Sequence, residues 1–230
     1  MPGKKVSRKK LLKEPDEFIS TTGKIIQYVR GHRRQIALYG IIAVAVVAAG
    51  LGGYSYLLWQ EGKAQAIQQQ ALQQYQEAFL KGPNAEGERE NYKKSMEKFR
   101  EALAVYSRGN VSQVSQVYIG HCHFALKEYD QAIAAYSRCL EGPFRVMALD
   151  GLAHCYESKG DFAKALENYQ KNMEEDRSPF QGEGLLGAAR CYEALNQKQK
   201  ALEVYQKALT RNPNSRMAEF IQRKVSELKG

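Results

Sequence analysis

Three segments of the chain share one pattern, which begins with YIGHCHFALKEYDQAIAAYSRCL at residues 118–140. The second is GLAHCYESKGDFAKALENYQKNM at 151–173, and the third is GAARCYEALNQKQKALEVYQKAL at 187–209. Each carries a small residue in its first half, and an alanine followed four residues later by tyrosine in its second half. These matched residues are Gly120, Ala153 and Ala189, then Ala132, Ala165 and Ala201, then Tyr136, Tyr169 and Tyr205. The recurrence of one pattern in three successive segments predicts stacked helical hairpins, since one hairpin alone cannot bury its apolar face.

The pattern resembles the tetratricopeptide repeat, a helix–turn–helix unit of about 34 residues. The resemblance covers residues 113–213 closely, although the tryptophan of the family consensus is missing from all three copies. It implies an all-α fold in which 113–213 form three repeats of an α-solenoid. Residues 60–112 are expected to form a linker helix and a degenerate first unit, and residues 214–230 a C-terminal capping helix.

Cysteines occupy the same position in each repeat and suggest core packing instead of chemistry. Cys122, Cys155 and Cys191 each follow the small residue at a fixed offset, and free cysteine is among the most buried residue types. His121 and His123 flank the first of them, but residues two apart on a helix point away from each other and cannot share a metal. No pattern of catalytic residues stands out. We therefore expect no enzyme activity, no metal and no cofactor.

A row of polar and aromatic residues on the first helix of each repeat is the candidate binding site. In this repeat family the first helices line a concave groove, so the resemblance implies that the row faces a partner. We expect it to contact an extended or helical segment of a partner protein, with charge complementarity giving selectivity. The alternative is that these are ordinary solvated residues. The row consists of His121, His154 and Arg190 together with Phe124, Glu157 and Glu193.

Residues 36–59 form an apolar run of 24 residues, IALYGIIAVAVVAAGLGGYSYLLW, without a charge. As a helix the run would be about 36 Å long, enough to cross a hydrocarbon core of about 30 Å. Its ends carry aromatic residues, which prefer the membrane interface. A buried core helix is seldom apolar on every face, and a cleaved signal peptide has a shorter apolar region. The run is therefore predicted to be an uncleaved transmembrane signal anchor. Within it, Ala45, Ala49 and Gly53 form a column of small residues against which a second transmembrane helix could pack.

Most of the net basic charge of the chain lies before this run. Residues 1–60 have a net charge of +7 and residues 61–230 only +2. Basic residues that flank a span stay in the cytoplasm, so residues 60–230 are expected on the periplasmic side. Residues 1–35 are read as a cytoplasmic tail that attracts anionic lipid head groups and contains a short amphipathic helix at 16–30. The nearly neutral repeat region argues against a nucleic-acid partner.

This layout of basic tail, single anchor and repeat domain resembles that of the ancillary subunit of the bacterial Sec translocon. The resemblance implies a single-pass protein of the bacterial inner membrane, in which the repeats bind periplasmic proteins or peptides and the span joins a membrane complex. Two alternatives stay open. One is a scaffold for outer-membrane or cell-wall assembly, and the other is a cytoplasm-facing subunit whose basic tail binds polyanions. The sequence specifies neither the client nor the oligomeric state.

Overall fold

The computed structural model describes residues 17–82, 86–174, 181–211 and 217–230, and within them the chain forms ten helices and no strand. It divides into two compact units, Met1–Leu58 and Trp59–Gly230. The helices are α2 (Glu17–Gly31), α3 (Arg33–Lys81), α4 (Glu88–Val105), α5 (Gly109–Ala125), α6 (Tyr129–Ser137), α7 (Arg145–Ser158), α8 (Phe162–Glu174), α9 (Gln181–Ala194), α10 (Lys198–Arg211) and α11 (Ala218–Lys229).

The first unit contains α2 and the apolar part of α3. Helix α2 corresponds to the amphipathic helix expected at 16–30, and the basic residues 1–15 lie outside the described residues. By length and composition, α3 is the one helix among the described residues that could cross a membrane, and none of its apolar window is buried. Ala45, Ala49 and Gly53 are all exposed on it.

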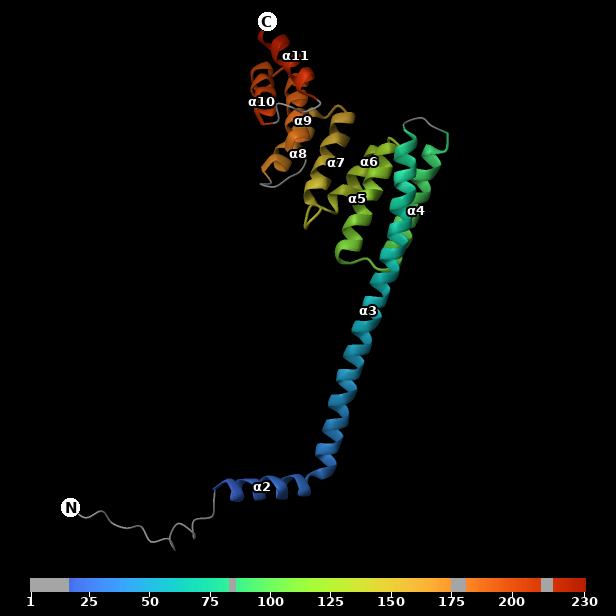
Figure 1. Ribbon diagram of the computed structural model, residues 1–230, viewed down its shortest axis with the longest axis vertical. Helices are drawn as coiled ribbons and strands as arrows, with labels where there is room; N and C mark the ends of the chain where they lie inside the picture. Colours follow the sequence, from blue (N-terminus) through green and yellow to red (C-terminus); the bar gives the residue numbers. More distant parts are fainter. Residues whose placement is uncertain (1–16, 83–85, 175–180, 212–216) are drawn as a thin grey trace, which may run out of the picture. The chain divides into compact units, whose positions relative to one another are not determined.

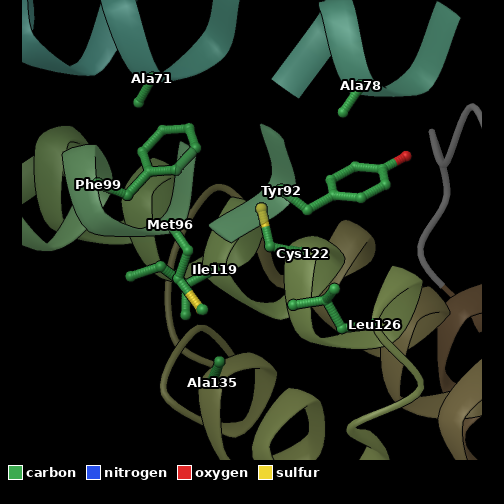
Figure 2. Packing of buried hydrophobic residues seen from close by; sticks show 9 residues of the cluster. All are labelled: Ala71, Ala78, Tyr92, Met96, Phe99, Ile119, Cys122, Leu126 and Ala135. Atoms are coloured by element: carbon green, nitrogen blue, oxygen red, sulfur yellow. The ribbon is translucent and has the colours of Figure 1, made fainter. Parts of the chain in front are cut away.

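The second unit begins with a hairpin made by the end of α3 and by α4. Its core is shown in Figure 2, where Ala71 and Ala78 of α3 lie opposite the rings of Phe99 and Tyr92 of α4. A buried hydrogen bond reinforces the pair, because the hydroxyl of Ser95 donates to the carbonyl of Ala71 at 2.8 Å. Residues 60–112 thus contain the hairpin that the sequence suggested as a degenerate first unit.

Three further hairpins follow, α5–α6, α7–α8 and α9–α10, and α11 packs against α10 (Figure 1). Each contributes to a separate apolar cluster with the first helix of the next unit. The first helices also touch one another, α5 against α7 and α7 against α9. The predicted all-α solenoid of tetratricopeptide-like hairpins is therefore confirmed.

Buried tyrosines fill the gaps between the hairpins, and glycines make room for them. A Cβ atom on Gly120 would lie 2.5 Å from the ring of Tyr136, and one on Gly151 would lie 2.4 Å from it. The ring is thus held between the first helices of two successive repeats. Gly187 has the same relation to Tyr169, at 2.3 Å. Close packing of this kind leaves no space for even one methyl group.

The turn inside each repeat requires one residue in the left-handed region. This residue is Gly160 in the second repeat, Asn196 in the third and Lys127 in the first, where φ is +65°. Glycine and asparagine adopt this conformation readily, whereas lysine does so at a cost in free energy. The resulting turn brings the second helix back against the first.

All four cysteines are buried and free, as the core interpretation requires. Burial raises the pKa of the thiols of Cys122, Cys155 and Cys191 to about 12 and that of Cys139 to about 11. They are therefore thiols, not thiolates, at neutral pH, and thiols are poor nucleophiles and poor metal ligands.

Candidate binding surface on the first helices

The six residues predicted to form the binding row lie on α5, α7 and α9, and most of them contact the row residue of a neighbouring helix. We call them the first-helix row: His121, Phe124, His154, Glu157, Arg190 and Glu193. The ring of Phe124 meets that of His154 edge-on, with centroids 6.4 Å apart. The carboxylate of Glu157 accepts hydrogen bonds from the guanidinium group of Arg190. The row is therefore connected across helices, a property that helical spacing alone did not predict.

The tyrosine of each second helix reaches the row with its hydroxyl group. Tyr136 lies 2.7 Å from Nδ1 of His121, Tyr169 donates to Glu157 at 2.7 Å, and Tyr205 donates to Glu193 at 2.7 Å. The rings of these tyrosines are fully buried. A phenol that is buried in a core still needs a polar partner, and the row supplies one in each repeat.

From α7 onward the row is held together by ion pairs. The guanidinium group of Arg190 donates to both carboxylate oxygens of Glu157, at 2.6 and 2.9 Å. Burial opposes ionisation of Glu157, but the hydrogen bonds from Arg190 and Tyr169 outweigh it, so the pKa of Glu157 lies below its usual value. One repeat later, Lys224 of α11 donates to Glu193 at 3.1 Å. These charges are satisfied within the protein itself.

At α5 the row is aromatic and neutral. His121 lies among the rings of Tyr75, Tyr118 and Tyr136, with centroid separations of 6.2, 5.4 and 5.4 Å. Burial lowers the pKa of His121 to about 4, with a smaller contribution from His154. The imidazole is therefore uncharged at neutral pH, in contrast to the charged partners of Tyr169 and Tyr205.

Two members of this surface were missed at the level of sequence. Lys224 follows Glu193 by 31 residues, whereas Arg190 follows Glu157 by 33, and that near match was the available signal. Tyr75 lies on α3, where no strict repeat pattern exists. Its partner ring, Tyr118, lies three residues before His121, so helical spacing already predicts that these two residues are neighbours.

His121 and His123 do not share a site, as their spacing predicted. His121 contacts Tyr136, whereas Nδ1 of His123 lies 2.5 Å from the carboxylate of Glu128. In the part of the chain that the structure describes, no three histidine, cysteine, aspartate or glutamate residues group as a metal site would require.

Comparisons with known proteins agree with this architecture. The tetratricopeptide repeat family matches residues 144–214 with one model and residues 117–141 with another. No curated protein is detectably similar in sequence.

Several solved structures share the fold at low sequence identity. A tetratricopeptide repeat protein from Parabacteroides merdae superposes with a TM-score of 0.57 and 18% identity, covering 72% of this chain and 61% of that one. A Podosopora anserina chain with nearly identical TPR-like repeats gives 0.56 and 16%, covering 73% and 86%. The MamA RS-1 ArsTM double mutant gives 0.51 and 15%, covering 74% and 94%.

The chain therefore contains tetratricopeptide repeats. Such repeats stack into surfaces that bind other proteins, which gives this chain the role of an adaptor or scaffold.

Proposed function

We propose that the protein is a membrane-anchored adaptor whose first-helix row binds partner proteins on the periplasmic side of a bacterial inner membrane. In this proposal the N-terminal tail lies in the cytoplasm and contacts anionic lipid head groups. The span at residues 36–59 packs against a membrane complex through Ala45, Ala49 and Gly53. The repeats assist protein translocation or pass clients to periplasmic chaperones, without chemistry of their own.

The observation that carries the proposal is the continuity of α3 (Arg33–Lys81). One helix contains both the exposed apolar run and, in its last turns, the alanines that pack against α4. Exposed apolar side chains over such a length are unfavourable in water and favourable in lipid. The charge distribution supports the orientation, because Lys24, Arg30, Arg33 and Arg34 precede the run.

Within the row, we place the partner contact at the aromatic end. The carboxylates of Glu157 and Glu193 are already paired, so a partner would have to break those contacts to use them. The rings of Tyr118 and Phe124 are only partly buried and offer apolar area with little entropy to lose. Aromatic side chains are also those most often found at the centre of protein interfaces.

A topology reporter tests the orientation. Alkaline phosphatase fused after Gly230 should be active in cells, because it folds only in the periplasm. Deleting residues 1–15 should weaken the orientation preference without removing membrane association. An inactive fusion would contradict the proposal and favour the cytoplasm-facing alternative.

Site-specific photo-crosslinking in intact membranes tests the partner contact. A photoreactive phenylalanine at Tyr118 or Phe124 should form adducts, whereas the same group at exposed Lys171 or Glu203 on the second helices should not. Adducts identified as translocon subunits or periplasmic chaperones support the proposed role. Adducts with outer-membrane or cell-wall assembly proteins would favour the envelope-scaffold alternative instead. Equal adduct yields at all four positions would remove the row from the interface.

A further inference from the structure

A basic cleft of about 320 Å³ opens between α4, α5 and α6, away from the first-helix row. Its charged lining residues are Arg100 and Arg138, both exposed, and no carboxylate lines it. Its floor includes Ile119 and Ala135, which are buried. The cleft therefore combines two cations with an apolar surface.

A buried histidine positions Arg100 at this cleft. A guanidinium nitrogen of Arg100 lies 3.4 Å from Nε2 of His123, and Nδ1 of His123 lies 2.5 Å from the carboxylate of Glu128. Arginine can only donate, so Nε2 of His123 accepts and its Nδ1–H donates to Glu128. The imidazole separates Arg100 from the carboxylate, and the described residues include no carboxylate paired directly with Arg100.

Arg138 also lacks the ion-pair partner that the equivalent lysine of the next repeat has. In the second repeat the residue two after the buried tyrosine is Lys171, and it pairs with Glu167 at 2.6 Å. In the first repeat the residue two after Tyr136 is Arg138, and the position four before it is Ala134 instead of glutamate. Within the described residues no ion pair to Arg138 forms.

The corresponding space is occupied in the other repeats. Tyr156 and Tyr192 stand where the first repeat has His123, and each ring has a lysine ammonium over its face, that of Lys164 at 5.3 Å and that of Lys200 at 5.6 Å. Gln170, which follows Tyr169 as Arg100 follows Phe99, donates to the hydroxyl of Tyr192 at 2.9 Å. In the first repeat the smaller His123 replaces the tyrosine and the uncharged Gln131 replaces the lysine, and both line the cleft.

We infer that this cleft binds an acidic side chain of a partner protein together with an adjoining apolar side chain. The carboxylate pairs with the guanidinium groups of Arg100 and Arg138, which match its planar geometry. The apolar neighbour covers Ile119 and Ala135. A free phosphate would leave that floor uncovered, so a protein segment fits the lining better. The inference rests on the proposed protein-binding function but concerns a second surface, on the side of the second helices.

Binding of a defined peptide to the full-length protein in detergent micelles tests the inference. The probe is a fluorescent peptide of alternating leucine and glutamate, compared with the same peptide carrying glutamine in place of glutamate. Changing Arg100→Ala and Arg138→Ala together should weaken binding of the acidic peptide by at least about tenfold, because both charge-assisted pairs are lost. The glutamine peptide should bind weakly to either protein.

Two matched variants separate a specific site from general charge. Ala134→Glu installs the carboxylate that the second repeat already has, and it should weaken binding by about tenfold, because it pairs with Arg138 and also repels the carboxylate of the peptide. Lys171→Ala removes an exposed cation elsewhere and should change affinity by less than about twofold. Far-UV circular dichroism should be the same for all variants.

Unchanged peptide binding in both Arg100→Ala/Arg138→Ala and Ala134→Glu would overturn the inference, as would an equal loss in Lys171→Ala. Inorganic phosphate that displaces the probe as well as unlabelled peptide does would also overturn it and indicate a phosphate site. The photo-crosslinking experiment at Tyr118 and Phe124 distinguishes this failure from failure of the proposed function. If only the cleft assignment is wrong, those crosslinks still form. Absence of those crosslinks would instead count against the proposed function.

Discussion

The two ends of the first-helix row use the same positions for different chemistry. At α5 the row is aromatic and neutral, with His121 surrounded by tyrosine rings. At α7 and α9 it is charged, with Glu157 paired to Arg190 and Glu193 paired to Lys224 of α11. The tyrosine that each repeat places behind the row is the same.

This difference separates what holds the repeats together from what they can offer a partner. An ion pair that joins consecutive first helices fixes their spacing and leaves its charges satisfied. A cluster of rings that is partly exposed keeps apolar area available. A row that looks uniform by position is therefore expected to act as a structural link at one end and as a binding surface at the other.

The buried rings of the tyrosines should matter about equally at both ends, and the loss of the whole side chain is the largest effect we expect. Tyr136→Ala and Tyr169→Ala should each lower the free energy of unfolding by about 3–5 kcal/mol, because a buried ring is replaced by a cavity. Urea titration of the full-length protein followed by circular dichroism measures this. The exposed Glu203→Ala serves as control and should change it by less than about 0.5 kcal/mol. A loss confined to one of the two tyrosines would show that the repeats are not equivalent in packing.

Acid should weaken the aromatic end through His121. Its pKa is about 4 in the folded protein and 6.5 as a free side chain, so the unfolded state binds a proton first as pH falls. Its contribution to stability is therefore complete above pH 6.5 and is lost progressively towards pH 4. Wild type should lose about 3 kcal/mol across this window from this group.

His121→Gln keeps an acceptor for the Tyr136 hydroxyl but cannot take up the proton. Urea titrations at several pH values should show a smaller loss of stability for this variant than for wild type. Curves that fall in parallel would mean that His121 is protonated in the folded protein at its ordinary pKa.

Much of this architecture could be predicted from the sequence, because it depends on spacing. The recurrence of Gly120, Ala153 and Ala189 and of the second-helix tyrosines predicts the hairpins. The same pattern identified Cys122, Cys155 and Cys191 as core residues, and all three are buried.

The chemistry of the row was not predictable in the same way. Helical spacing places Glu157 and Arg190 on equivalent faces, but it does not show that they meet across two helices at 2.6 Å. The distance depends on how the two repeats pack, and there the ring of Tyr169 lies directly against Gly187 of α9. The basic cleft depends on a departure from the repeat at His123, which a search for shared positions passes over.

The ion-paired end can be broken selectively at Arg190. Arg190→Ala leaves Glu157 partly buried with only Tyr169 as a hydrogen-bond donor, so the free energy of unfolding should fall by about 1–2 kcal/mol at neutral pH. The value is limited because the arginine side chain is 41% exposed. The pKa of Glu157 is lowered in the folded protein, so this contribution is present above pH 4.5 and lost as pH falls further. An effect that persists undiminished in acid would show that Arg190 acts through packing instead of charge.

The smallest difference compares the hydroxyl groups at the two ends. Tyr169→Phe removes a hydrogen bond to the carboxylate of Glu157, whereas Tyr136→Phe removes one to the neutral imidazole of His121. Hydrogen bonds to charged groups contribute about 1.5–3 kcal/mol and neutral ones about 0.5–1.5 kcal/mol, so the first change should cost more. Tyr205→Phe, which loses its bond to Glu193, should resemble Tyr169→Phe. Urea titration of the three variants gives the order directly. If Tyr136→Phe costs as much as the other two, the aromatic end is held as tightly as the charged end. The reason for placing the partner there would then be lost.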